Sequence, residues 1–214
     1  SFMTRKSDTI TEETKARLVH SAESEFALHG FKGASLRQIC KEAEVTTGAL
    51  YFLFKDKDDL FRSVISPVTE AVRDLVNQHY MEESMLSQLN ASESEDEDFR
   101  AAEAIVGIYF KKRRICNIIF QNRDHEAVRD FFDELAALID DETKKLIYKL
   151  YPDFLAASAF NERSIHWFSH LQIDSVTQIL EHSVDEAQAN EQLKVMIRFM
   201  RGGFFSVVEG LEKV

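Results

Sequence analysis

Residues 35–60 read SLRQICKEAEVTTGALYFLFKDKDDL, and this stretch decides the fold. It opens on a Ser-x-x-Gln capping box, which predicts that a short helix starts after Ser35. A tight turn follows, and a second short helix begins at Thr46 or Thr47. Two short helices joined by a tight turn are the layout of a helix-turn-helix motif, which we place at about residues 35–54.

The two sides of the second short helix differ in chemistry. Leu50, Leu53 and Phe54 fall on one side and are expected to enter a small core. The other side carries a hydroxyl, a glycine, two aromatic rings and an ammonium group: Thr47, Gly48, Tyr51, Phe52 and Lys55. Such a side suits a phosphate and groove surface, because a helix N-terminus offers free N–H groups to phosphate and glycine allows close approach. The alternative is that Tyr51 and Phe52 only fill the small core.

The rest of the chain also has helical periodicity. With 7 Gly and 2 Pro among 214 residues, and 44% hydrophobic residues, the composition favours an all-α fold over an all-β one. A helix precedes the motif and ends at Gly30, and another begins after Asp56 and is interrupted by Pro67. We place the domain boundary there, which gives an N-terminal domain of residues 1–66 and a C-terminal domain of residues 67–214.

The C-terminal domain begins with an unusual segment. Residues 82–98 are acidic and serine-rich and hold no Lys or Arg, so we predict a solvated loop. Long helices are expected at about 99–122, 125–150, 161–184 and 186–212, with a break at Tyr151–Pro152.

Net charge is −11, but it is unevenly distributed. Residues 1–66 hold ten Lys and Arg and ten Asp and Glu, so the whole excess of acid belongs to the C-terminal domain. A neutral first domain is compatible with a DNA-binding head but does not require one.

Several classes of protein are excluded or disfavoured. No apolar run approaches the roughly 20 residues that span a bilayer. No secretory signal is seen, and Ser1 and Phe2, ahead of Met3, are left out of the fold prediction. Cys40 and Cys116 make neither a disulfide framework nor a zinc motif. No P-loop, dinucleotide fingerprint, nucleophile elbow or HExxH motif is present, so we expect a cytoplasmic, non-enzymatic protein without a cofactor or a membrane partner.

The quoted stretch resembles the TetR family of bacterial transcriptional regulators, whose pattern runs roughly T-x-x-x-I-A-x-x-A-G-V-S-x-G-x-x-Y-x-H-F-x-x-K-x-x-L. The matching positions are Ser35, Ile39, Ala43, Val45, Thr46, Gly48, Tyr51, Phe54, Lys57 and Leu60. The preceding helix, which ends in His29-Gly30-Phe31, is also similar. The resemblance covers about residues 11–65, and the rest of the chain is similar only in length and helical content.

The resemblance implies a role for individual residues in DNA binding. Phosphate contacts are implied for Thr46, Thr47, Tyr51 and Lys55. Contacts with base edges or thymine methyl groups are implied for Arg37, Thr47, Gly48 and Phe52, and Ser35 completes the predicted DNA-binding set. Phosphate contacts position such a domain, and base contacts specify the sequence.

This chain departs from the family pattern at three positions. Cys40 replaces the usual Ala, Glu44 the usual turn Gly, and Leu53 the usual His. Glu44 matters most, because a non-Gly residue at positive φ costs on the order of 1 kcal/mol. Its carboxylate would also face phosphates unfavourably.

By the same resemblance, the chain is a dimer that binds a palindromic double-stranded DNA operator. The last two long helices would form the dimer interface, and the apolar stripe of the last one includes Met200, Gly203, Phe204 and Val207. The alternative is that this stripe belongs to the core of one chain. A helix-turn-helix dimer reads two half-sites about 35 Å apart, or a multiple of that distance.

The resemblance further implies a small-molecule effector bound between the middle helices. The aromatic residues that we select as candidates are Tyr109, Phe110, Phe120, Phe131, Trp167 and Phe168. The alternative is that they are ordinary core residues. The expected function is a repressor whose operator affinity changes with a ligand; the alternatives are an activator, or an interaction protein that has lost useful DNA affinity.

One further pattern has the spacing of metal ligands. His166, His170 and Asp174 stand at i, i+4 and i+8 and share one helical face. Such a set on an exposed helix is more often plain surface, so we predict no metal there.

Overall fold

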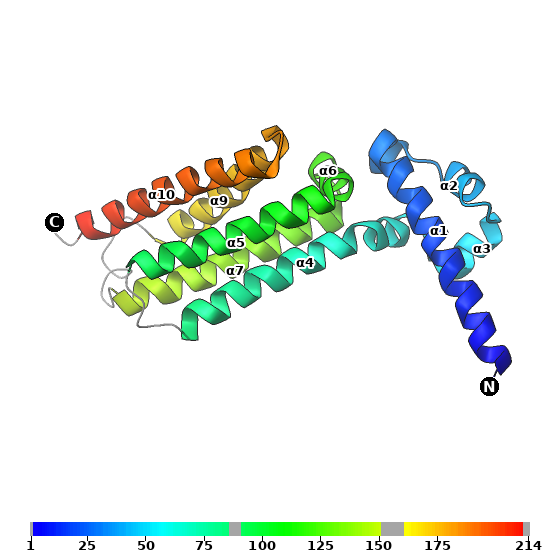
Figure 1. Ribbon diagram of the computed structural model, residues 1–214, viewed down its shortest axis with the longest axis horizontal. Helices are drawn as coiled ribbons and strands as arrows, with labels where there is room; N and C mark the ends of the chain where they lie inside the picture. Colours follow the sequence, from blue (N-terminus) through cyan, green and yellow to red (C-terminus); the bar gives the residue numbers. More distant parts are fainter. Residues whose placement is uncertain (1, 86–90, 151–160, 212–214) are drawn as a thin grey trace. The chain divides into compact units, whose positions relative to one another are not determined.

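The computed structural model describes residues 2–85, 91–150 and 161–211, and all regular structure in these ranges is α-helical (Figure 1). The predicted all-α class is therefore confirmed. The described helices are α1 (Phe2–Gly33), α2 (Leu36–Glu42), α3 (Thr47–Leu53), α4 (Lys57–Met85), α5 (Ala91–Lys111), α6 (Arg113–Gln121), α7 (Glu126–Leu150), α9 (Glu162–His182) and α10 (Glu186–Leu211). Within these ranges no helix is long and apolar enough to cross a membrane.

The chain divides into two compact units. The first contains Ser1–Glu70 and Lys112–Arg129, and the second contains Ala71–Lys111 and Asp130–Val214. The division falls four residues after the predicted boundary. It also joins α6 and the start of α7 to the first unit, although the sequence analysis assigned them to the C-terminal domain. These residues join because they pack and hydrogen-bond against α1 and α4, contacts that no local pattern encodes.

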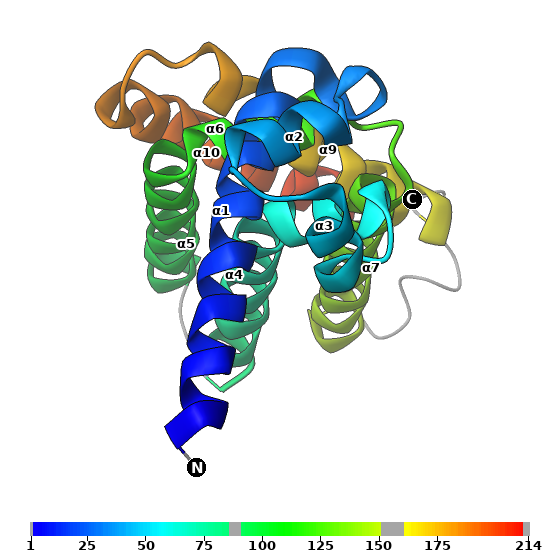
Figure 2. The same ribbon diagram turned by 90° about the vertical axis from the view of Figure 1, so that its right-hand side faces the viewer.

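In the first unit, α1, α2 and α3 lie close together (Figure 2), and aromatic residues of α1 and α4 contribute to the core of this unit. Phe26 of α1 and Phe61 of α4 are fully buried and meet edge to face, with ring centroids 5.1 Å apart. Gly30 ends the regular part of α1, as predicted, because its φ of 64° lies in the left-handed region that glycine tolerates. The helix already begins at Phe2.

The fourth helix continues through Pro67 instead of restarting there. Proline has no N–H to donate to the carbonyl of Ser63, four residues earlier. The Ser66 hydroxyl donates to that carbonyl instead, at 3.4 Å. A side chain thus replaces the missing backbone hydrogen bond, and the helix does not restart at the proline.

In the second unit, α10 packs against both α5 and α9. Ile147 of α7, Ile165 of α9 and Phe204 of α10 form a shared buried cluster. The predicted loop over residues 82–98 is wrong at both ends, because α4 reaches Met85 and α5 starts at Ala91. Two acidic side chains of α5, Glu95 and Asp98, pair with arginines of α10.

The arginines that pair with these acids lie about a hundred residues later in the chain. Arg198 donates to Glu95 at 2.6 Å, and Arg201 donates to Asp98 at 2.5 Å. The single helix predicted at 99–122 is also wrong, since it is two helices separated at Lys112, whose φ of −123° and ψ of 31° are not helical. The predicted break at Tyr151–Pro152 lies outside the described residues.

Candidate nucleic-acid interface

The first helix of the motif is fixed at its start and on its inner side. The hydroxyl of Ser35 accepts from the Gln38 N–H at 3.4 Å, so the predicted cap is present. The Ser35 N–H donates to the Glu25 carboxylate of α1 at 3.0 Å. On the inner side Ile39 is fully buried, and its carbonyl accepts from the Ser21 hydroxyl at 2.9 Å. The other side of α2 therefore faces outward.

The turn between the two helices is a Schellman motif. The Val45 N–H donates to the Cys40 carbonyl at 2.9 Å, and the Glu44 N–H donates to the Lys41 carbonyl at 3.2 Å. This pattern needs a left-handed residue at Glu44, whose φ is 54°. Among the described residues Glu44 is the only non-glycine with a positive φ, as the sequence analysis expected.

The second helix, α3, is capped by Thr46, whose hydroxyl accepts from the Ala49 N–H at 3.2 Å. Leu50 and Phe54 are buried in the core of the first unit. On the outward side, Tyr51 is 56% exposed and Phe52 is 82% exposed. Neither ring fills the core, so that alternative is wrong for both.

The remaining predicted residues share this outward surface, which we call the motif face. Its members are exposed side chains or backbone of α2, the turn and α3: Ser35, Arg37, Thr46, Thr47, Gly48, Tyr51, Phe52 and Lys55. The motif face also includes Lys41, which sequence reasoning missed; Lys41 is exposed on α2 and lines an open recess with Ser35, Arg37 and Gln38. Its signal was the i, i+4 spacing from Arg37.

Some positively charged side chains of the first unit form ion pairs, and others do not. Away from the motif face, Arg62 pairs with Asp58 at 2.6 Å and Lys32 pairs with Asp124. Within the described part of the chain, the side chains of Arg37, Lys41 and Lys55 form no ion pair. Residues 1–66, whose formal charge is zero, therefore present three unpaired cations on the face where phosphate would bind.

Cys40 lies directly behind this face. Burial raises the pKa of its thiol, and a hydrogen bond with Thr47 opposes that shift. The thiol is thus a small buried group under the start of α3 and not a nucleophile.

Behind the motif, the loop between α6 and α7 holds the end of α1. The Asn122 side-chain oxygen accepts from the Phe31 N–H at 2.8 Å. His125 contacts the Phe31 and Phe61 rings, at centroid distances of 4.2 and 4.3 Å, and its Nε2 lies 2.9 Å from an Asp58 oxygen. Sequence reasoning missed this corner, because its residues lie more than 60 positions from those they contact.

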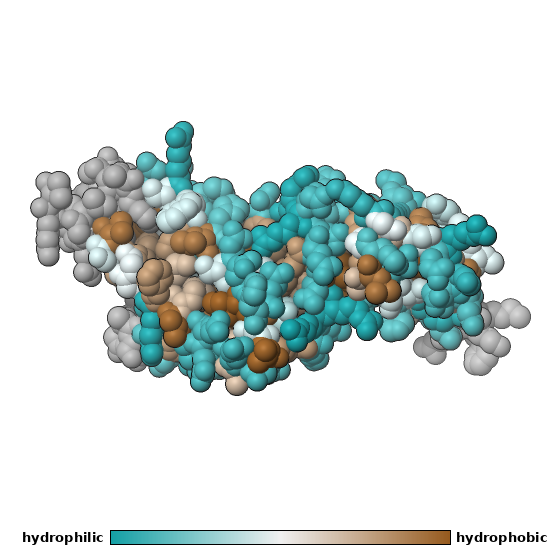
Figure 3. All heavy atoms as spheres, turned by 90° about the horizontal axis from the view of Figure 1, so that it is seen from above, coloured by the Kyte–Doolittle hydropathy of each residue, from teal (hydrophilic) through white to brown (hydrophobic). Residues whose placement is uncertain are grey.

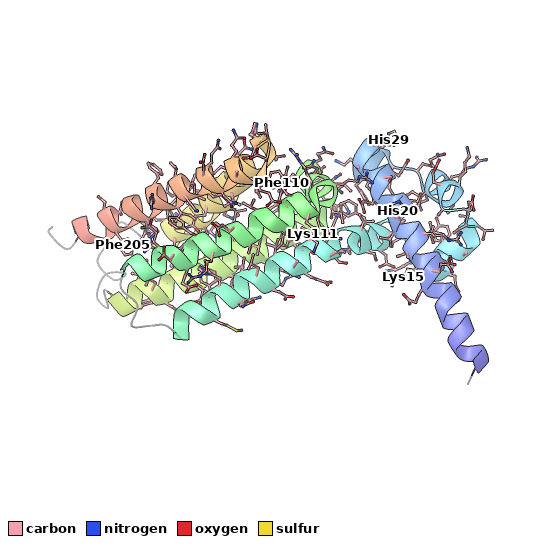
Figure 4. The ribbon with its side chains drawn as sticks, viewed as in Figure 1. Lys15, His20, His29, Phe110, Lys111 and Phe205 are labelled. Atoms are coloured by element: carbon pink, nitrogen blue, oxygen red, sulfur yellow. The ribbon has the colours of Figure 1, made fainter. Side chains whose placement is uncertain are left out.

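The predicted effector residues do not form one group. Tyr109 and Phe131 are buried in the second unit, and Phe110, at the end of α5, and Phe168 are partly buried there (Figure 4). Trp167 is 62% exposed. Phe120 belongs to the first unit.

The predicted dimer residues divide between core and surface. Met200 and Phe204 are buried within the second unit, where the tilted rings of Phe204 and Phe168 have centroids 5.5 Å apart. Gly203 and Val207 are exposed on the other side of α10. That side has further exposed members, which together we call the α10 stripe: Val195, Phe199, Gly202, Gly203, Ser206 and Val207.

The N-terminal part of the chain is similar in sequence to known proteins. Residues 18–64 match the family described as "Bacterial regulatory proteins, tetR family". The chain is 40% identical over 62 residues to the HTH-type transcriptional regulator AcrR of Shigella flexneri, an alignment that covers 29% of each chain. It is 41% identical over 54 residues to the HTH-type transcriptional repressor SCO4008 of Streptomyces coelicolor, covering 25% of this chain and 28% of the repressor. The chain thus matches less than a third of these relatives' own length.

The similarity in fold to solved structures covers more of the chain than the sequence similarity does. A crystal structure of a gamma-butyrolactone receptor, described as ArpA-like, matches with a TM-score of 0.58 and 18% sequence identity, covering 95% of this chain and 98% of that one. This similarity concerns the fold of both units.

Proposed function

The chain belongs, through its N-terminal helix-turn-helix domain, to the TetR family of bacterial regulators, and from this we propose that it is a sequence-specific DNA-binding transcriptional regulator. The observation that carries the proposal is the motif face. It combines exposed hydroxyls, two exposed aromatic rings and three unpaired cations on helices whose inner sides are fixed in the core. We assign DNA binding to residues 1–66, and ligand binding and dimerisation to residues 67–214.

Roles on the motif face follow from chemistry. Thr46, Thr47, Tyr51 and Lys55 carry hydrogen-bond donors at the start and along the outer side of α3, and we assign them to phosphate oxygens. Arg37 suits a guanine edge. Phe52, exposed and apolar, suits a thymine methyl group in the major groove.

The regulator acts as a dimer on a palindromic operator in this proposal. The α10 stripe supports dimerisation, because apolar side chains and two glycines lie on one exposed helix side. A Cβ atom added to Gly202 or Gly203 would meet no atom within 4 Å, so packing inside the chain does not require glycine at either position. A second backbone approaching closely would require it. Figure 3 shows brown, hydrophobic residues exposed on the second unit, seen from the side on which α10 lies.

We further propose that the regulator is a repressor and that a small apolar molecule in the second unit alters its operator affinity. Buried Tyr109 and Phe131 supply apolar walls for such a ligand. The fold match to a protein described as a gamma-butyrolactone receptor favours a ligand-responsive regulator. Coupling of this kind typically changes affinity by about 5–150-fold.

The test is a selection of random duplex DNA on the purified protein at low and at physiological salt. We expect one palindrome to be enriched. The double variant Tyr51→Ala/Lys55→Ala should bind it more weakly and nearly uniformly across sequences, and should reduce the slope of log K against log salt by about 1. Tyr148→Ala/Lys111→Ala is the matched control, because Tyr148 is 54% exposed, Lys111 is exposed on α5 (Figure 4), and both lie in the second unit.

The outcomes separate the alternatives. If the motif-face variant binds as tightly as the parent, the contact assignment is wrong. If no sequence is enriched at either salt, either the head needs its ligand in order to bind DNA, or the chain is an interaction protein that retained the fold of the head without its DNA affinity.

A further inference from the structure

Two histidines on α9 point their outer nitrogens at one another. His166 and His170 lie one helical turn apart, and their Nε2 atoms are 3.2 Å apart. Their rings meet edge to face, with centroids 4.5 Å apart. Both Nε2 atoms are therefore directed toward the same small region of the protein surface.

The ring of His166 is held in place from a neighbouring helix. Its Nδ1 lies 2.8 Å from one oxygen of Asp140 on α7, and the Ser169 hydroxyl donates to the other oxygen at 2.5 Å. Both carboxylate oxygens are thus occupied, and Asp140 orients the imidazole. When Nδ1–H donates to Asp140, the neutral ring keeps its lone pair on Nε2, which is the nitrogen that a metal ion would bind.

The distance between the two nitrogens suits a shared ion. Two ligands at about 2.0–2.1 Å from a tetrahedral ion lie roughly 3.3 Å apart. With His166 in the tautomer that donates Nδ1–H to Asp140, His170 Nε2 is the donor to His166 Nε2. Moving the His170 proton to Nδ1 then frees both Nε2 lone pairs. A cation entering between them would thus replace one hydrogen bond with two coordinate bonds while the ring of His166 remains in place.

Contrary to the prediction of no metal made from the residue spacing alone, we propose from this geometry that His166 and His170 chelate a divalent transition-metal ion, with Asp140 as the residue that positions His166. The ion is of the class that prefers imidazole, such as Zn²⁺, Ni²⁺ or Cu²⁺, and not Mg²⁺ or Ca²⁺, which prefer oxygen ligands. Among the described residues no three His, Cys, Asp or Glu side chains converge as a metal site. The described residues therefore supply two ligands, and we assign the other coordination positions to water.

The experiment uses the untagged full chain after treatment with a chelator. Calorimetric titration with Zn²⁺ should show one ion bound per chain, unaffected by excess Mg²⁺. With Cu²⁺ as the probe, electron paramagnetic resonance should show hyperfine coupling to two imidazole nitrogens. Zn²⁺ should also raise Tm, because an ion that binds only the folded state stabilises it by mass action.

Variants assign the ligands and the positioning residue. Asp140→Asn should weaken Zn²⁺ binding by about 10–100-fold. His166→Gln and His170→Gln should each weaken it more and should leave fewer than two coupled nitrogens. His182→Gln is the matched control, because His182 is an exposed histidine on the same helix whose Nδ1 bonds the Gln178 carbonyl.

The proposal is overturned if the parent binds no Zn²⁺, in which case the two rings are only a hydrogen-bonded pair. It is equally overturned if His182→Gln loses as much affinity as His166→Gln, or if the double variant His166→Gln/His170→Gln keeps the parent's affinity. If the parent and the variants have equal Tm values in the presence of chelator, misfolding does not explain a loss of Zn²⁺ affinity. None of these outcomes depends on whether the protein binds DNA.

Discussion

Glu44 combines two unfavourable features at one residue. Its backbone is left-handed, which costs an L-residue about 1–2 kcal/mol, and its carboxylate is exposed in the turn between α2 and α3. Glycine would remove both, whereas alanine would remove only the charge. The two substitutions therefore separate strain from electrostatics.

We expect Glu44→Gly to raise the free energy of unfolding by about 1 kcal/mol, and Glu44→Ala to leave it nearly unchanged. Both should strengthen DNA binding at low salt, because both remove a negative charge near phosphates. Urea denaturation and a binding titration measure the two effects. An equal gain in stability from both variants would show that the left-handed backbone is not the source of the strain.

His125 makes the first unit sensitive to pH. Burial against Phe31 and Phe61 lowers the pKa of His125, and Arg62 lowers it further, while Asp58, Asp124 and Glu126 oppose the shift. The Ala127 N–H donates to Nδ1 of this ring, so the neutral form is the one that fits. The unfolded chain takes up a proton near pH 6.5, and the folded one does so only at lower pH.

The neutral His125 ring therefore makes its full contribution to the free energy of unfolding above about pH 6.5. This contribution is lost as the pH falls below that value, because the unfolded chain takes up the proton first. We expect the parent to lose more unfolding free energy between pH 7.5 and 5.5 than His125→Asn, which has no titrating ring. His20→Gln is the control, because His20 is an exposed histidine on α1 (Figure 4). If His20→Gln alone flattens the pH profile, the dependence does not come from the buried ring.

At the scale of the element, the Ser66 hydroxyl explains how α4 continues through Pro67. We expect Ser66→Ala to destabilise the parent by about 1 kcal/mol, because the Ser63 carbonyl then loses its donor. In a Pro67→Ala background the backbone N–H is restored, and Ser66→Ala should have little effect. A double-mutant cycle by urea denaturation measures this coupling, and additive effects would contradict it.

Elements that depend on neighbouring residues were predictable from the sequence. The caps at Ser35 and Thr46, the turn at Glu44 and the stop at Gly30 all involve contacts within five positions. The start of α5 was not predictable, because Glu95 and Asp98 are neutralised by arginines a hundred positions away. The outward side of α3 followed from helical periodicity, whereas the absence of ion pairs at Arg37 and Lys41 depends on which acids fold elsewhere.

At the scale of the whole molecule, the proposed function requires two heads on one operator. A single head neutralises only its own share of phosphates, so both affinity and salt dependence should depend on dimerisation. The α10 stripe offers the surface for it. Phe199, 75% exposed at the middle of the stripe, is the side chain that a partner would cover most.

We expect Phe199→Glu to convert the dimer to monomers in sedimentation experiments, because a carboxylate buried without a partner is strongly unfavourable. Operator affinity should fall, and the slope of log K against log salt should drop to about half, since one head then binds without the other. Val184→Glu is the matched control, because Val184 is 74% exposed outside the stripe, just after α9. Monomers with an unchanged salt slope would mean that each head binds independently. A Phe199→Glu variant that stays dimeric would place the interface elsewhere on the chain.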